Sequence, residues 1–390
     1  MNDSATLKLQ LDRIRTRALL VGVVALALSA VWAFKDQQQF FQSYLLGYMF
    51  WIGISLGSFA IVALHHLTTG GWGFAIQRLL EAASRTLPLM ALLVLPFLFG
   101  MQELFLWARP EAVANDAVLQ HKAPYLNATF FWVRIVVYFA IWSAFTYFLN
   151  KWSKLQDDTS EGGFINRIEK ISGPALVFYV LTVSFAAFDF VMSLEPHWFS
   201  TIFGVMFVIG QVLLTMAFAI VVVAQLRHQQ PLAEVMQTKH FHDLGNLMMA
   251  FILLWAYMSF SQFFIIWSGN LPEEIPWYLH RLDGGWQVVA LLIVVFHFAV
   301  PFMVLLSRKS KRRAHILWRV ALAMIFMRWV DLFWIIAPNF HEHGFAIHWL
   351  DVVLPVGIGG LWIAYFLWQL QGRPLLPVND PRLREAFAHE

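Results

Sequence analysis

Apolar runs of membrane-spanning length dominate this sequence. The chain has 390 residues, of which 59% are hydrophobic and only 13% charged. A helix needs about 20 apolar residues to cross the hydrocarbon core of a bilayer. Because lipid offers backbone groups no hydrogen bonds, an apolar chain of this kind crosses it as helices. The sequence predicts an all-α polytopic membrane protein with about ten transmembrane helices, at 18–34, 42–64, 86–106, 128–149, 173–194, 200–226, 244–268, 285–306, 314–336 and 349–370.

The connections between these runs are short. None is long enough to bury a core of its own, so we predict a single transmembrane domain over residues 1–371 and a tail over 372–390. The first run is not expected to be a cleavable signal, because no small-residue cleavage site follows it and further runs do. Gly53 and Gly57, four residues apart, predict a close contact between two helices.

The positive residues predict the topology. Lys and Arg concentrate on the cytoplasmic side of membrane proteins. With the N-terminus inside, the cytoplasmic segments hold 20 of the 27 Lys and Arg residues and the opposite segments hold 4. Both termini are therefore predicted to be cytoplasmic. A nucleic-acid patch is the competing interpretation of Arg308 to Arg313, but topology explains this cluster, and no nucleic-acid partner is expected.

The residue types present restrict the redox chemistry of the chain. It has no cysteine, which excludes disulfides and thiolate-bound metal or iron–sulfur clusters within it. A haem between helices needs facing histidines, yet only His297 lies well inside a predicted span. His341, Glu342 and His343 are metal-ligand types without a fourth ligand, so no metal site is predicted. Any electron carriers are expected in partner subunits.

Charged residues inside the spans are the candidates for function. An ionisable group in hydrocarbon costs at least about 3 kcal/mol and usually faces the bundle interior or a wet cavity. Asp189 lies in the outer third of its span, and Arg328 and Asp331 share one helical face three residues apart. The predicted group in the outer half comprises Asp189, Arg328, Asp331, Arg134, Glu103 and Asp351.

A second polar group is predicted on the inner side, with few polar residues between the two. The inner group comprises His65, His66, Asp243 and His242, together with His240, Glu81, Arg85 and Arg319. The residues near the midplane are His297, Tyr257, Ser259 and Ser261. Carboxylates shift their pKa with desolvation and histidine titrates near neutrality, so these side chains are suited to passing protons. We expect two wet half-channels joined by a thin polar bridge.

Each of these residues also has a structural interpretation. Arg328 and Asp331 are equally explained as a static ion pair that holds helices together. His297 alone is typical of a packing histidine, and the histidines near span ends are typical of the interface. The residues themselves leave both interpretations open.

Two sequence blocks resemble a known family. Residues 186–204, AAFDFVMSLEPHWFSTIFG, resemble the membrane subunits of alternative complex III, which belong to the NrfD or polysulfide-reductase membrane-anchor family. A second block resembles the ActF type of these subunits: HFHDLG at 240–245, WAYMSFSQF at 255–263 and LPEE at 271–274. The similarity extends over essentially all ten predicted helices.

The resemblance implies a fold and a cellular setting. It implies two four-helix bundles flanked by two further helices, in a bacterial inner membrane. The complex would oxidise quinol and pass electrons to cytochrome c. Its other parts would be a paralogous NrfD-like quinol-binding subunit, an iron–sulfur subunit, multihaem cytochrome c subunits and small membrane subunits.

The resemblance also implies the role of this chain. The chain would bind no haem or cluster itself, would support quinol oxidation structurally, and would conduct protons; whether it also binds quinol or quinone stays open. The outer path would contain Asp189, Arg328, Asp331, Arg134 and Glu103, and the inner path His65, His66 and Asp243. The alternatives are a membrane anchor without a proton relay and a secondary transporter, which binds solute at the midplane between broken helices.

Overall fold

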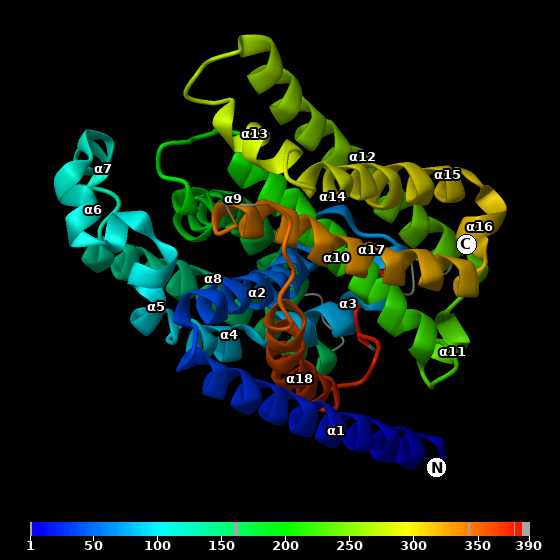
Figure 1. Cartoon of the computed structure of the whole chain (residues 1–390). Helices are drawn as coiled ribbons and strands as arrows, with labels where there is room; N and C mark the ends of the chain where they lie inside the picture. Colours follow the sequence, from blue (N-terminus) through cyan, green and yellow to red (C-terminus); the bar gives the residue numbers. More distant parts are fainter. Residues whose placement is uncertain (1, 160–162, 342–343, 378, 384–390) are drawn as a thin grey trace.

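A computed structural model describes every residue except 1, 160–162, 342–343, 378 and 384–390. The described chain is helical, with no strand (Figure 1). It contains nine helices long and apolar enough to cross a membrane, or ten if one bent pair forms a single span. The prediction of an all-α multi-pass membrane protein is therefore confirmed at this level.

The long helices follow the predicted runs closely. They are α1 (Asn2–Ala33), α2 (Gln37–Thr68), α8 (Ala128–Asp157), α9 (Gly163–Phe190), α10 (Phe203–Leu226), α12 (Thr238–Gly269), α17 (Ala314–Ile336) and α18 (Leu350–Leu370). The predicted eighth run consists of α14 (Trp286–Ile293), a π-helical turn (Val294–Ala299) and α15 (Val300–Leu306). The short connecting helices are α6 (Pro110–Asn115), α7 (Ala117–Lys122), α11 (Leu232–Val235), α13 (Pro276–Leu282) and α16 (Arg308–Arg312).

The predicted third span is broken. The predicted range, 86–106, contains α4 (Leu87–Leu93) and α5 (Phe97–Leu104), and α3 (Gly71–Ser84) precedes it; the segment Gly71–Leu93 meets α5 at a bend of 72°. Pro96 lies at this bend, and proline has no N–H to continue a helix. Tyr44 and Tyr48 of α2 donate their hydroxyls to the carbonyls of Leu93 and Met90, at 2.7 and 3.2 Å. These bonds satisfy backbone oxygens beside the break.

Helix α2 is the central element and is buried along most of its length. It contacts α10 closely at Gly57, where an added Cβ would lie 2.2 Å from the Thr215 hydroxyl and 2.6 Å from the Gln211 carbonyl oxygen. Gly53 lies on the same face, where an added Cβ would lie 3.4 Å from Gln211 Cγ. The predicted small-residue contact is therefore confirmed, and α10 is the partner.

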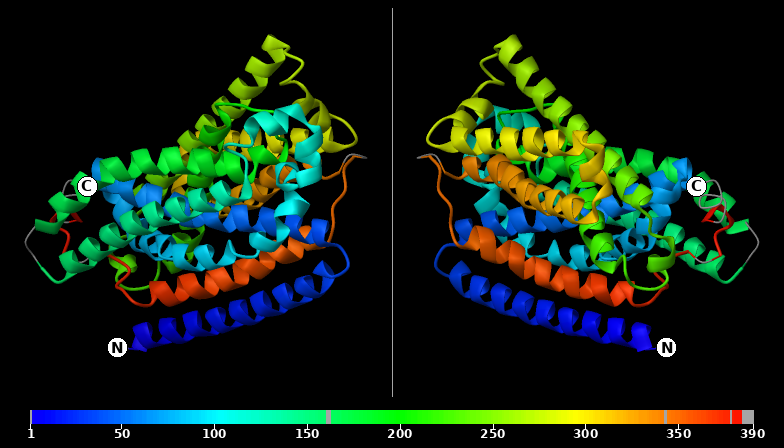
Figure 2. Two further views of the ribbon diagram at one scale, coloured as in Figure 1. Left: turned by 90° about the vertical axis from the view of Figure 1, so that its left-hand side faces the viewer. Right: turned by 90° about the vertical axis from the view of Figure 1, so that its right-hand side faces the viewer.

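The outer helices have different environments. Figure 2 shows α1 running beside α18 along one edge, where Gly22 and Gly360 allow the two backbones to approach closely. Helix α12 leans out of the bundle, so that its C-terminal end projects from the molecule (Figures 1 and 2). We call the end that holds the start of α1 and the end of α18 the terminal end, and the opposite end, with α6 and α7, the loop end.

Candidate functional site

Asp189 forms a buried ion pair at the loop end. It lies one residue before the end of α9 and is fully buried. Arg134 of α8 donates from Nη2 to Oδ1 at 2.7 Å and from Nε to Oδ2 at 3.0 Å, and Tyr138 donates its hydroxyl to Oδ2 at 2.8 Å. The remaining Arg134 nitrogen, Nη1, donates to the Tyr125 carbonyl at 2.8 Å. Two predicted residues thus meet, because α8 and α9 pack against each other.

Arg328 and Asp331 form the predicted pair on one face of α17. The Arg328 guanidinium lies against Gly210 of α10, where an added Cβ would lie 2.4 Å from Cζ. Any larger residue at position 210 would displace this cation. Arg328 Nε has no hydrogen-bond partner among the described residues. The pair itself lies within α17, and Gly210 leaves the space in which the Arg328 guanidinium packs against α10.

Asp331 also lines an apolar cavity of about 650 Å³. The cavity lies where α12 leans away from α14, and its walls include Trp255, Tyr278 and Trp334. Tyr257, predicted near the midplane, lines the same cavity and is 63% exposed. Tyr257 therefore faces the surface of the bundle, and no hydrogen bond joins its side chain to the described residues of either charged group.

Asp351 is stabilised by neutral donors. It lies in the first turn of α18, where the helix dipole favours a negative charge. The Ser43 hydroxyl donates to Oδ1 at 2.5 Å, Gln39 Nε2 donates to Oδ1 at 3.2 Å, and the His348 backbone N–H donates to Oδ2 at 2.8 Å. Asp351 is fully buried. Unlike Asp189 and Asp331, it makes no ion pair with a described residue.

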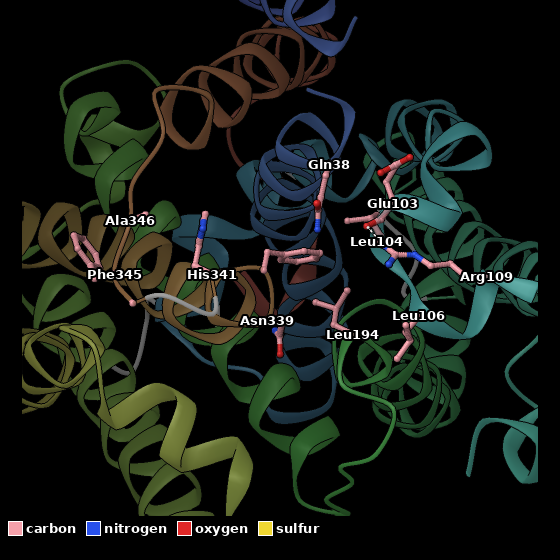
Figure 3. A pocket seen from close by; sticks show the side chains of 12 residues that line it. Gln38, Glu103, Leu104, Leu106, Arg109, Leu194, Asn339, His341, Phe345 and Ala346 are labelled. Atoms are coloured by element: carbon pink, nitrogen blue, oxygen red, sulfur yellow. Dashed lines mark hydrogen bonds between the residues drawn. The ribbon is translucent and has the colours of Figure 1, made fainter. Parts of the chain in front are cut away.

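A cavity of about 790 Å³ opens at the loop end, with His341 in its wall. Figure 3 shows Gln38 and Asn339 between His341 on one side and Glu103 with Arg109 on the other. We call this cavity the vestibule. The structure places Glu103 in its wall, where Arg109 Nη2 donates to the Glu103 backbone carbonyl at 3.3 Å.

His341 joins the vestibule to the Asp351 site. Its Nε2 lies 3.1 Å from Nε2 of Gln42, the residue before Ser43. Partial burial lowers the pKa of His341 below its usual value of 6.5, and the nearby Asp351 opposes this shift. His341 therefore lies between buried Asp351 and the open vestibule as a group that titrates below neutral pH.

The terminal end has its own buried carboxylate, Glu81 of α3. Its carboxylate accepts from Arg78 Nη1 at 2.6 Å, from Arg373 Nη1 at 2.9 Å, from the Ser153 hydroxyl at 2.6 Å and from Gln77 Nε2 at 2.9 Å. Arg78 also pairs with Asp157 of α8. Since Arg373 follows α18, three distant segments of the chain meet at this one carboxylate.

His65 and His66 are buried at the end of α2. The His65 ring packs on α3, where an added Cβ at Gly73 would lie 1.8 Å from Nδ1, and its centroid lies 4.7 Å from that of Phe74. Nδ1 of His66 lies 3.3 Å from Nη2 of Arg382 in the tail. The two histidines thus lie beneath the described part of the C-terminal segment.

His242 and Asp243 form a separate pair. They lie in the first turns of α12, half-buried, with His242 Nδ1 3.4 Å from Asp243 Oδ1. Asn246 Nδ2 lies 3.3 Å from the same ring nitrogen. Within the described part of the chain, no hydrogen bond or ion pair joins them to His65 or His66. The structure therefore divides the predicted inner group into two.

His297 lies in the π-helical turn beneath an indole. Its ring stacks on Trp255 with centroids 4.2 Å apart, and neither ring nitrogen has a hydrogen-bond partner among the described residues. The ring is fully buried. This arrangement is typical of a packing histidine, and it leaves two unsatisfied nitrogens close to α17.

The middle of the bundle contains polar side chains that the sequence interpretation missed. Tyr179 of α9 donates to Gln211 Oε1 of α10 at 3.1 Å, and the Thr215 hydroxyl donates to the Ile54 carbonyl of α2 at 3.3 Å. The hydroxyls of Ser55 and Thr86 lie 2.6 Å apart. Gln211 was visible in the sequence as an amide inside an otherwise apolar run. Asn150 and Ser84 continue the series toward Glu81, with Asn150 Nδ2 donating to Ser84 Oγ at 3.2 Å.

Arg78 and Arg373 were also missed. The spacing of Arg78 and Glu81 by three residues signalled a pair, as it did for Arg328 and Asp331. Nothing local signalled Arg373, which lies 292 residues from Glu81 in the chain. Arg281 was missed as well; it is buried, donates to the Ile335 carbonyl at 2.8 Å and lies 3.5 Å from Glu195.

The buried polar side chains of the bundle are of types that can bind and exchange protons. Buried carboxylates, hydroxyls, amides and histidines lie at both ends and along α2 and α10. Among the described residues, no group of three His, Asp or Glu side chains is close enough to hold a metal ion. No protein-family model matches the chain, and no curated protein matches it. The buried polar groups are thus the basis for proposing a function.

Proposed function

We propose that this chain is an integral membrane subunit of a quinol:cytochrome c oxidoreductase of the alternative complex III kind, and that it conducts protons. One observation carries the proton-conducting role. Buried carboxylates lie at both ends of the helices, and hydroxyl and amide side chains lie between them along α2, α9 and α10. Charged groups are costly in hydrocarbon, so buried carboxylates inside a bundle are candidates for a functional site.

The proposed path has an order. From the terminal end it begins at Glu81, which Arg373 links to Asn150, and Asn150 bonds Ser84. Thr86, two residues further, and its partner Ser55 continue it to the centre of α2. It continues along α10 by way of Thr215 and Gln211, and reaches Tyr179 and the Arg328 region. A cavity of about 10 Å³ beside Gln211 is close to the smallest volume that holds one water.

Two exits are available at the loop end. One is the Asp189–Tyr138 site, which is closed by Arg134. The other is Asp351, from which His341 leads to the vestibule. We favour Asp351 as the exit because its hydrogen-bond donors are neutral and because His341, which lines the vestibule, contacts Gln42 next to Ser43.

The orientation and the assembly are parts of the same proposal. Of the 20 Lys and Arg residues of the predicted inner segments, all but Arg384 lie within the described residues and are at the terminal end, which supports cytoplasmic termini in a bacterial inner membrane. The resemblance of residues 186–204 and 240–274 supports the two-bundle arrangement and the iron–sulfur, haem and paralogous partner subunits. Electron transfer belongs to those partners, and quinol or quinone is the redox molecule this chain would meet.

An anchor without a relay is the second candidate. Asp189, Asp331 and Glu81 each have an arginine partner, as static pairs require. Asp351 makes no ion pair with a described arginine, so a substitution of Asp351 can distinguish a proton relay from an anchor. A transporter is less favoured, since the carbonyls at the break in the third span accept bonds from Tyr44 and Tyr48 instead of lining a cavity.

The first experiment is purification of the tagged chain in a mild detergent. We expect haem and iron–sulfur subunits to co-purify with quinol-dependent reduction of cytochrome c. A colourless, inactive single protein, under conditions that keep other respiratory complexes intact, would contradict the proposed complex.

The second experiment tests the relay with Asp351→Asn. Asparagine keeps the shape and still accepts the Ser43 bond, so assembly should be unchanged, while the rate of quinol-dependent proton release should fall by about tenfold or more. Asp189→Asn, which leaves Arg134 without its partner, serves as the comparison. Unchanged proton release with Asp351→Asn would leave the anchor as the better explanation.

A further inference from the structure

A cationic cavity lies at the terminal end, beside the start of the proposed proton path, and Asn150 belongs to both. It has a volume of about 390 Å³ and lies between α8, α18 and the junction of α3 with α4. Four cations line it, Arg85, Lys151, Lys154 and Arg373, and among the described residues no carboxylate does. A cavity with this lining attracts an anion.

The two lysines project from one stripe of α8. Tyr147, Lys151 and Lys154 are spaced by four and three residues, so they share a helical face. The Lys151 ammonium lies 5.4 Å from the Tyr147 ring centroid. Both lysines are exposed and neither makes an ion pair with a described residue. Their charges are therefore available to a ligand.

The two arginines cross the gap between the walls. Arg85 Nη2 donates to the Gln369 carbonyl of α18 at 2.8 Å, and Arg373 Nη2 donates to the Asn150 carbonyl of α8 at 3.0 Å. Arg85 Nε also donates to the Glu81 carbonyl at 3.3 Å, and Arg373 Nη1 also donates to the Glu81 carboxylate at 2.9 Å, so both arginines are fixed in place. The base of the cavity is preorganised and cationic.

A buried hydroxyl in the wall has no partner. Thr146 of α8 is 6% exposed, lines the cavity, and its Oγ1 makes no hydrogen bond with the described residues. A buried hydroxyl without a partner is unfavourable. A bound ligand with acceptor oxygens would satisfy it.

An apolar surface continues from the cavity toward the loop end. Leu87 and Pro88 line the cavity itself. Leu92 and Leu95, on the same segment, are 65% and 47% exposed. The cations therefore lie near the ends of the spans, and an apolar track leads from them toward the middle. A ligand that matches both features has an anionic head and apolar chains.

We propose that this cavity binds the head group of an anionic phospholipid, with its acyl chains along α4. Phosphate oxygens would accept bonds from the lysines and arginines, as in other basic pockets between membrane helices. The apolar track favours a lipid over a soluble phosphate. This site does not depend on the proposed electron-transfer complex.

The test uses the purified full chain in an uncharged detergent. Phosphatidylglycerol, phosphatidylcholine and inorganic phosphate are titrated separately while thermal unfolding is recorded. We expect phosphatidylglycerol alone to raise Tm in a saturable manner. Lys151→Gln/Lys154→Gln should weaken its apparent affinity by about tenfold or more, since each lysine near the surface contributes to anionic-lipid binding.

The matched control is Lys170→Gln/Lys309→Gln, which removes two exposed lysines at the same end but outside the cavity. Its affinity for phosphatidylglycerol should stay within about twofold of the parent. Equal losses in both double variants would overturn the site, as would no shift with phosphatidylglycerol. An equal shift with inorganic phosphate would show that the site takes free anions instead of lipid.

Discussion

Each buried carboxylate of this protein has a different set of partners. Asp189 accepts bonds from an arginine and a tyrosine, whereas Asp351 accepts them from a serine, a glutamine and a backbone N–H. Burying a charge is costly, and a partner of opposite charge offsets that cost at the expense of its own desolvation. Paired and unpaired carboxylates should therefore respond differently to substitution.

Removal of Arg134 alone should be strongly destabilising. Arg134→Met leaves the Asp189 charge buried without its counter-ion, and breaking one side of a buried pair typically costs about 3–5 kcal/mol. Arg134→Met/Asp189→Leu removes both charges and should recover most of that loss. Thermal unfolding of the single and double variants in detergent measures the difference. A double variant no more stable than the single one would contradict the pairing.

His341 should make stability depend on pH. Its pKa in the folded protein lies below the usual 6.5, so protonation favours the unfolded chain. The stabilisation from this residue is present above about pH 6.5 and is lost as the pH falls below that value. Comparison of His341→Gln with the parent between pH 7.5 and about 5 should show the smaller decline in Tm in the variant. Parallel curves would exclude this role for His341.

At the scale of elements, close backbone contacts decide which polar groups meet. Gly57 brings α2 against α10 beside Gln211 and Thr215, and Gly210 brings α17 against α10 through Arg328. The glycines are needed because an added Cβ would occupy the same space as these polar side chains. The polar series of the middle therefore depends on helix packing as much as on the polar residues themselves.

Gly57→Leu should disrupt the contact between α2 and α10. An added Cβ at this position already lies 2.2 Å from Thr215 Oγ1, and overpacking of a closely packed contact costs about 1–3 kcal/mol or more. Gly173→Ala in α9 is the control, because nothing lies within 4 Å of an added Cβ there. Tm should fall for Gly57→Leu and stay near the parent for Gly173→Ala; equal values would show that the contact is not tight.

The lengths of the hydrophobic runs and the local spacing of charged residues allowed the spans and one ion pair to be predicted from the sequence. Runs of about 20 apolar residues specify spans, and a separation of three residues placed Arg328 beside Asp331. The partners of Asp351 could not be predicted, because spans that are apolar all round give no sign of which helices adjoin. Tyr257 shows the same limit: its place in the sequence suggested depth but not the direction it faces.

At the scale of the whole molecule, the distribution of Lys and Arg predicts that both termini are cytoplasmic. Because the chain has no cysteine, this orientation is easy to test by labelling. A chain with no cysteine accepts single reporters without further substitution. Lys309 and Glu273 are both exposed and lie at opposite ends of the helices. They are suitable positions for labelling.

Lys309→Cys should be protected from a membrane-impermeant maleimide in intact cells and react in inverted vesicles. Glu273→Cys should show the opposite pattern, because it lies at the loop end. Labelling of permeabilised cells provides the control for reactivity. If Lys309→Cys reacts in intact cells, the proposed orientation is inverted.

The contact between Arg373 and Glu81 has a consequence for how the protein is made. Glu81 is synthesised 292 residues before the arginine that helps to neutralise it. Until Arg373 is synthesised, Arg78 of the same helix is the arginine that pairs with Glu81. The cluster is therefore complete only after α18 has been synthesised, and a chain that stops before Arg373 would lack one of the two arginines that bond Glu81.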